Sequence, residues 1–149
     1  MPEDRQYCTF FLDGHYFGID VLQVQEVIRH QEMTRVPLAP PVVRGLINLR
    51  GQIVTAIDLR RRLDLPDRPE GELPVNVVVH TDDGAVSLLV DEIGDVLQVP
   101  EEAFERRPET LRGAARDLIR GAYKLDARLL LILDTERAVN LAESRGEQR

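Results

Sequence analysis

Short apolar stretches separated by turn residues run along most of the chain. Tyr7–Leu12 and Tyr16–Ile19 are rich in aromatic and β-branched residues and flank Asp13-Gly14, a tight-turn signal. The same arrangement recurs at Gly45–Leu49 and Gln52–Asp58. Further strands are predicted at Val75–His80, Ala85–Val90, Asp95–Val99, Ile119–Lys124 and Arg128–Leu133. Many short strands with turn signals between them predict a mainly β fold of small barrels.

Short helical segments are expected between these strands. Asp20 is placed to cap a helix over Val21–Ile28, on which Val21, Val24, Val27 and Ile28 would share one side. Further short helices are expected at Leu59–Leu63, Pro100–Phe104 and Asp134–Leu141, the last capped by Asp134. Three segments carry no clear strand pattern: Asp64–Leu73 is typical of a loop, Arg106–Arg116 is ambiguous, and Glu143–Arg149 is expected to be a frayed tail.

The two halves of the chain resemble each other. VRGLINLRGQIVTAIDL, from Val43, aligns without a gap on IRGAYKLDARLLLILDT, from Ile119. The alignment places Arg44-Gly45 on Arg120-Gly121 and Asp58 on Asp134. We therefore interpret residues 1–149 as a single domain with pseudo-repeated halves at approximately 7–63 and 74–141. About five strands in each half fit a small barrel of SH3-like type.

Arg50 is the one residue of the predicted hairpin Gly45–Asp58 that the geometry of a tight turn does not explain. It lies at the tip, where a tight turn favours Asn, Asp or Gly for backbone reasons. Its counterpart in the second half is Asp126, so the same hairpin is built there without arginine. We interpret Arg44-Gly45 and Arg120-Gly121 as architectural and Arg50 as available to bind a partner. The alternative is a charged tip that is merely solvated.

The amino-acid composition limits the functions that are expected of this protein. The 149 residues carry a net charge of −7 and no tryptophan, which argues against binding to nucleic acid or to anionic membranes. The single cysteine, Cys8, excludes an internal disulfide and fits a reducing compartment. We see no signal peptide and no apolar run long enough to span a bilayer. These features predict a cytoplasmic protein.

Catalytic and metal-binding motifs are missing from the sequence. The histidines His15, His30 and His80 lack the spacing of metal ligands, and no phosphate-binding or nucleophile motif is found. The four aspartates at strand ends are interpreted as helix caps: Asp20, Asp58, Asp91 and Asp134. We expect no enzyme, no cofactor and no metal. A hydrolase that uses these aspartates and a barrel that binds nucleic acid are the alternatives from other classes.

Several segments together resemble the CheW family, the scaffold proteins of bacterial chemosensory arrays. They are Gly18–Asp20, Val24–Ile28, Val43–Val54, Ile57–Arg60, Val90–Ile93 and Leu131–Asp134, and the resemblance spans Tyr7 to Leu141. The asparagine-leucine-arginine-glycine hairpin followed by Ile57–Arg60 is its most specific part. The resemblance implies two packed five-stranded SH3-like β-barrels with a few short helices and partly intertwined strands.

The same resemblance implies a non-enzymatic adaptor in chemotaxis signal transduction. Such a protein couples the cytoplasmic tip of methyl-accepting chemoreceptors to the CheW-like domain of the two-component histidine kinase CheA, with CheW–CheW contacts in rings. It would be recruited to membrane-associated arrays without inserting into the membrane. The alternative is a CheW-like module of a non-motility pathway, for twitching or biofilm signalling. A CheV-type or CheA-type protein would need a further domain, for which we expect no room in 149 residues.

The resemblance also implies site residues. Those expected to bind the receptor are Val24, Glu26, Ile28 and Arg50. The alternative for Val24 and Ile28 is a core position, and for Glu26 a solvated charge. Those expected to bind the kinase are Asn76, Val86 and Ser87. Ser87 stands where many relatives carry glycine, which puts the kinase contact there in question.

Overall fold

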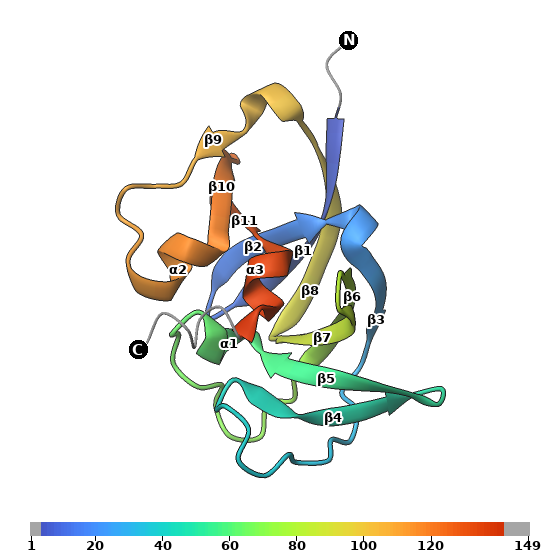
Figure 1. The fold of residues 1–149 in the computed structure, drawn as a ribbon. Helices are drawn as coiled ribbons and strands as arrows, with labels where there is room; N and C mark the ends of the chain where they lie inside the picture. The colour runs from blue at the N-terminus through green and yellow to red at the C-terminus, as the bar shows by residue number, and fades with distance from the viewer. Residues whose placement is uncertain (1–3, 142–149) are drawn as a thin grey trace.

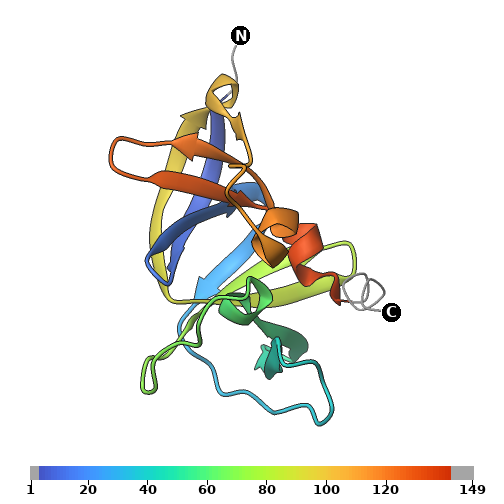
Figure 2. The same ribbon diagram turned by 90° about the vertical axis from the view of Figure 1, so that its left-hand side faces the viewer.

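Strand pairing divides the molecule into two sheets, each the basis of one lobe. The computed structural model describes residues 4–141. The terminal lobe has the strand order β8-β1-β2-β11-β10-β9, and the central lobe has the order β3-β6-β7-β5-β4. The strands are β1 (Asp4–Leu12), β2 (His15–Asp20), β3 (Val24–Ile28), β4 (Val43–Leu49), β5 (Gln52–Asp58), β6 (Val75–Thr81), β7 (Gly84–Val90), β8 (Glu92–Pro100), β9 (Glu105–Arg106), β10 (Ile119–Lys124) and β11 (Leu129–Leu133). Figures 1 and 2 show the lobes stacked one on the other.

The helices are short and lie at the ends of strands. They are α1 (Leu59–Arg62), α2 (Gly113–Leu118) and α3 (Thr135–Val139), with 3₁₀ turns at Val21–Gln23 and Glu101–Ala103. The helical segments predicted after Asp58, Pro100 and Asp134 are confirmed. So are the hairpins β1–β2, β4–β5, β6–β7 and β10–β11 and the mainly β fold class. The tail Glu143–Arg149 lies outside the described residues.

The predicted helix over Val21–Ile28 is wrong. Asp20 does cap the segment, since its carboxylate accepts a hydrogen bond from the Leu22 amide at 2.9 Å, but the helix stops after one 3₁₀ turn. Val24–Ile28 continues as β3 and pairs with β6. The β-branched residues of this segment are poor helix formers, and a strand lets them pack on a sheet neighbour.

Each half of the sequence contributes strands to both lobes. The first half gives β1 and β2 to the terminal lobe and β3, β4 and β5 to the central lobe, while β6 and β7 join the central lobe and β8 to β11 the terminal lobe. Parallel pairing of β2 with β11 and of β5 with β7 joins these segments. Repeat-related positions make the same bond: the Asp58 amide donates to Val42 at 2.8 Å and the Asp134 amide donates to Leu118 at 2.7 Å.

The buried apolar side chains form three cores. One lies in the terminal lobe around Tyr123 and Leu130, and one lies in the central lobe around Ile47 and Val78. The largest lies between the lobes and takes residues from both, including Phe10 of β1. Burial of this shared core is the main force that packs the two sheets together.

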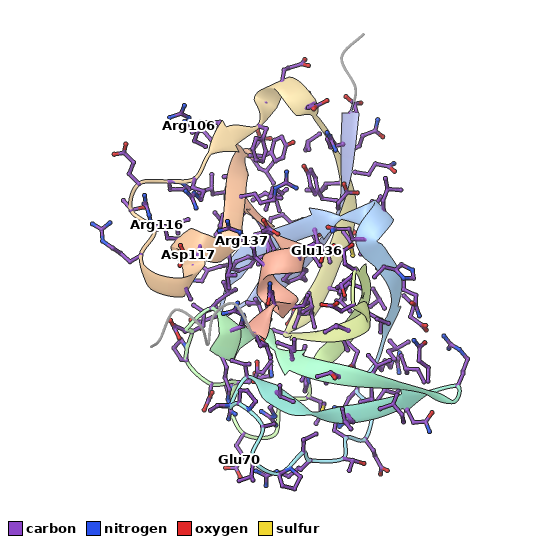
Figure 3. The ribbon with its side chains drawn as sticks, in the orientation of Figure 1. Glu70, Arg106, Arg116, Asp117, Glu136 and Arg137 are labelled. Atoms are coloured by element: carbon purple, nitrogen blue, oxygen red, sulfur yellow. The ribbon has the colours of Figure 1, made fainter. Side chains whose placement is uncertain are left out.

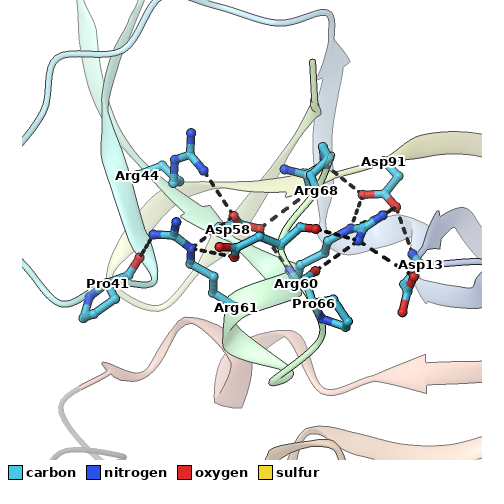
Figure 4. Close-up of polar contacts among 10 residues, drawn as sticks. Asp13, Pro41, Arg44, Asp58, Arg60, Arg61, Pro66, Arg68 and Asp91 are labelled. Carbon is cyan, nitrogen blue, oxygen red and sulfur yellow. Dashed lines mark hydrogen bonds and ion pairs between the residues drawn. The ribbon is translucent and has the colours of Figure 1, made fainter. Parts of the chain in front are cut away.

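An ionic cluster reinforces the junction of the lobes (Figure 4). Asp91, between β7 and β8, accepts hydrogen bonds from Arg60 and Arg68, each at 2.9 Å, and from the Asp13 amide at 2.8 Å. Arg68 also pairs at 3.6 Å with Asp58, which is 1% exposed.

Asp58 caps α1 and Asp134 caps α3, as predicted, but no helix follows Asp91. The capping prediction for Asp91 is therefore wrong: its partners are Arg60, Arg68 and the Asp13 amide, all distant in sequence.

Candidate protein interface at the β4–β5 hairpin tip

The tip of the β4–β5 hairpin is a two-residue turn. Leu49 pairs with Gln52, which leaves Arg50 and Gly51 as the central residues, with φ of 52° and 89°. The side chain of Asn48 accepts a hydrogen bond from the Gly51 amide at 2.9 Å. Positive φ at both central positions favours Asn-Gly and disfavours a bulky first residue. The backbone therefore gives no reason for an arginine at position 50.

Arg50 is tied to Glu26 by an ion pair. Arg50 Nη2 donates to the Glu26 carboxylate, and this contact joins the hairpin tip to β3, at the opposite edge of the same sheet. Hydrogen bonds from Arg50 and from Gln25 lower the pKa of Glu26, so the pair is charged at neutral pH. The Arg50 side chain stays 72% exposed, against 21% for Glu26. The guanidinium therefore keeps donors free for a partner.

The predicted receptor-binding residues of β3 do not share one face. A bulge between Val24 and Glu26 shifts the register, so that Val24 lies opposite Val79 and packs on the core between the lobes. Ile28 packs instead on the core of the central lobe. Glu26 lies beside Arg50, whereas Val24 and Ile28 are half-buried packing residues. The structure thus brings Glu26 and Arg50 together and leaves Val24 on a different face.

Ile53 is an exposed apolar residue near the same tip that the sequence interpretation missed. It lies on β5 opposite Asn48 and is 60% exposed. Its counterpart in the repeat, Leu129, is also exposed. The signal was present in the sequence, because an alternating strand that buries Val54 must turn Ile53 outward.

Of the residues predicted to bind the kinase, two are fully buried. Asn76 and Ser87 are both 0% exposed. The Ser87 hydroxyl donates to Asn76 Oδ1 at 2.7 Å, and Asn76 Nδ2 donates to the Arg29 carbonyl at 3.2 Å. Neither side chain has surface for a partner to contact. Val86, on β7, is half-buried and packs on the core between the lobes, so it is the member of this set that leaves part of its side chain exposed.

Gly45 and Gly121 lie at equivalent bulges, where other chain segments approach closely. A Cβ at Gly45 would lie 2.7 Å from the Thr34 carbonyl oxygen, and one at Gly121 would lie 2.4 Å from the Glu105 carbonyl oxygen. These backbone atoms leave no room for a side chain. The geometry supplies a physical reason for glycine at both positions.

Comparison with known proteins identifies the family. Residues 6–143 match the family model of the CheW-like domain. The chain belongs to the CheW family. It is 34% identical to chemotaxis protein CheW of Bacillus subtilis over 142 residues, which cover 95% of this chain and 91% of that protein. It is 31% identical to chemotaxis protein CheW of Klebsiella aerogenes over 139 residues, which cover 93% of this chain and 84% of that protein.

A solved structure supports the same assignment for this CheW-family chain. Scaffolding protein TtCheW from Thermoanaerobacter tengcongensis superimposes with a TM-score of 0.82 at 26% identity, covering 94% of each chain. The match confirms the CheW-like fold that the sequence motifs implied. None of the helices within residues 4–141 is long and apolar enough to cross a membrane.

Proposed function

We propose that this CheW-family chain is a non-enzymatic adaptor that couples chemoreceptors to the histidine kinase CheA. In this proposal, the receptor tip binds at the end of the β4–β5 hairpin, where Arg50 and Glu26 meet. Arg50 supplies the charged contact and Ile53 an apolar contact beside it. An interface of this kind, with an arginine next to exposed apolar surface, is typical of protein recognition.

One observation carries the receptor proposal: Arg50 is an exposed arginine in a left-handed turn position that favours Asn or Gly. A bulky residue at positive φ that the backbone does not need is a feature of functional sites. The Glu26 carboxylate limits the positions that the guanidinium can take. That restraint reduces the conformational entropy lost when a partner binds.

The kinase is proposed to bind a different part of the central lobe, around Val86 on β7. The buried hydrogen bond between Asn76 and Ser87 holds β6 and β7 in register, on the face of the sheet opposite to Val86. Contacts between copies of the chain in rings belong to the same proposal. The chain would then reach a membrane-associated array through its protein partners.

A binding experiment tests the adaptor function. The purified protein is incubated with a receptor cytoplasmic fragment and with a CheA-type kinase from the same genome, each immobilised separately. The parent is expected to bind both, and Arg50→Ala is expected to lose the receptor and keep the kinase. If the parent binds neither partner, the adaptor proposal is overturned, because the chain then shares the fold of the family without its function.

A second candidate is the same adaptor role in a non-motility chemosensory pathway. The chain is 29% identical over 115 residues to protein PilI of Pseudomonas aeruginosa, which cover 76% of this chain and 64% of that protein. Deletion of the gene separates the candidates. Loss of swimming in soft agar with normal surface motility and biofilm favours chemotaxis, and the opposite pattern favours the second candidate.

A further inference from the structure

A groove rich in arginine lies in the terminal lobe. It has a volume of about 810 Å³ and is formed by β9, α2, β10 and the start of α3. We call it the arginine groove; its lining residues are Phe104, Arg106, Arg107, Glu109, Arg116, Asp117, Ile119, Arg120, Asp134 and Arg137. Figure 3 shows Arg106 on β9, Arg116 and Asp117 on α2, and Arg137 on α3. The groove is separate from the hairpin tip, which lies in the central lobe.

The charge of the arginine groove is opposite to that of the chain. Five arginines line it against three carboxylates, whereas the whole protein carries a net charge of −7. A surface with net positive charge in a protein of net negative charge creates a local field that attracts an acidic ligand. The excess positive charge is therefore a property of this surface and not of the composition.

Three of the five guanidinium groups have no partner within residues 4–141. Arg107 donates to the Arg116 carbonyl at 2.6 Å, and Arg137 pairs with Asp134 at 3.9 Å, so these two arginines contribute to the wall of the groove. The exposed side chains of Arg106, Arg116 and Arg120 form no hydrogen bond or ion pair with the described residues. Their donors are available to a ligand.

The ligand that fits this lining is an acidic segment of a partner protein. Guanidinium groups pair in bidentate fashion with carboxylates, and Phe104, 39% exposed, gives an apolar contact in the same groove. Glu109, Asp117 and Asp134 would repel a densely charged polyanion such as nucleic acid, as would the acidic surface beyond the groove. A peptide with spaced carboxylates avoids that repulsion.

We propose that the arginine groove binds an acidic peptide segment of a partner protein, with its carboxylates on Arg106, Arg116 and Arg120 and an apolar side chain on Phe104. This site goes beyond the receptor and kinase surfaces proposed above and does not depend on them. Since one exposed ion pair contributes little free energy, recognition depends on several pairs that form together.

Fluorescence anisotropy tests the proposal with a labelled synthetic peptide that repeats Glu-Glu-Ala-Phe. The comparison peptide carries Gln in place of Glu. The full chain is expected to bind the Glu peptide and not the Gln peptide, and Arg116→Gln with Arg120→Gln is expected to weaken binding about tenfold. The matched control, Arg29→Gln with Arg35→Gln, removes the same charge from exposed positions outside the groove and is expected to stay within about twofold.

Three results would overturn the inference. Equal binding of the two peptides would exclude recognition of carboxylates. Equal weakening by the groove and control variants would show non-specific attraction. Displacement of the Glu peptide by inorganic phosphate, at constant ionic strength, would show a simple anion site and not a peptide groove. None of these results requires a receptor or a kinase, so a failure here is distinct from a failure of the adaptor function.

Discussion

Arg50 at the tip of the β4–β5 hairpin donates a hydrogen bond to Glu26 on β3, 24 residues earlier in the chain. The two residues come from opposite edges of one sheet, and their contact places an exposed guanidinium at a fixed position on the central lobe. The proposed adaptor function depends most on this relationship.

Substitution of Arg50 is expected to change binding much more than folding. Arg50→Ala removes an exposed side chain, so the free energy of unfolding should change by no more than about 0.5 kcal/mol. Arg50→Asn places a residue that tolerates positive φ at the turn and should be at least as stable as Arg50→Ala. Urea unfolding of the three proteins measures both effects. A large loss of stability in Arg50→Asn would show that the arginine is mainly structural.

Gly45→Val is expected to destabilise the fold by about 3 kcal/mol, because the new side chain would collide with the Thr34 carbonyl at a bulge. Thermal and urea unfolding measure the loss. Gly71→Ala is the matched control: it lies in a loop with nothing within 4 Å of the added Cβ, so only its positive φ costs energy, about 1 kcal/mol. A Gly45→Val variant that melts with the parent would contradict the architectural role of this glycine.

Ser87→Ala tests the buried hydrogen bond between Ser87 and Asn76. The change leaves Asn76 Oδ1 without its hydroxyl donor in a fully buried position, which should cost about 1–3 kcal/mol of stability. Val86→Ser, on the neighbouring half-buried position, is expected to weaken kinase binding more than Ser87→Ala does. Unfolding curves and kinase titrations of the two variants provide the comparison. A stable Ser87→Ala protein with lost kinase binding would mean that Ser87 acts at the surface.

The ionic cluster at the junction of the lobes predicts a dependence of stability on pH. Burial alone would raise the pKa of Asp91, but hydrogen bonds from Arg60, the Asp13 amide and Arg68 outweigh it and lower the pKa below its ordinary value of 3.8. A carboxyl with a lowered pKa in the folded state stabilises the fold above its unfolded pKa, and the stabilisation is lost as the pH falls through the lowered value. Stability should therefore decrease below about pH 4.

Asp91→Asn should remove part of that pH dependence and destabilise the protein by about 3 kcal/mol at pH 7, because the guanidinium groups of Arg60 and Arg68 lose the carboxylate that they share. Urea unfolding between pH 3 and pH 7 measures both effects. Asp67→Asn is a control in the same loop region, since the Asp67 side chain is exposed and, among residues 4–141, pairs only with Arg61. Equal effects of the two substitutions would contradict the special role of Asp91.

Local features of the fold could be predicted from the sequence, and distant contacts could not. The β1–β2 and β4–β5 hairpins follow from turn residues between apolar runs, which act over a few positions. Val24–Ile28 forms a strand because it pairs with β6, about fifty residues later in the chain. The helical spacing of its apolar residues led instead to the prediction of a helix. Pairing between distant segments overrode a weak local preference.

In the candidate site too, local features could be predicted from the sequence and distant contacts could not. Arg50 could be singled out because the turn did not require it, but its partner Glu26 and the burial of Asn76 and Ser87 depend on tertiary structure. The segment Arg106–Arg116 was only ambiguous, yet it supplies much of the arginine groove. The recurrence of arginine at positions 112, 116 and 120 was a visible signal that a charged surface lay there.

The receptor-binding role of Arg50 is tested most directly by isothermal titration calorimetry with a receptor cytoplasmic fragment. Three proteins are compared: the parent, Arg50→Ala, and the charge-swapped variant Glu26→Arg with Arg50→Glu. Both variants are expected to fold, and each is expected to bind the receptor more weakly by over about 1 kcal/mol, because the swap restores the ion pair but not the guanidinium at the tip. Parent-like affinity in Arg50→Ala would contradict a receptor-binding role for Arg50. Parent-like affinity in the swapped variant would show that Arg50 acts only as a structural partner of Glu26.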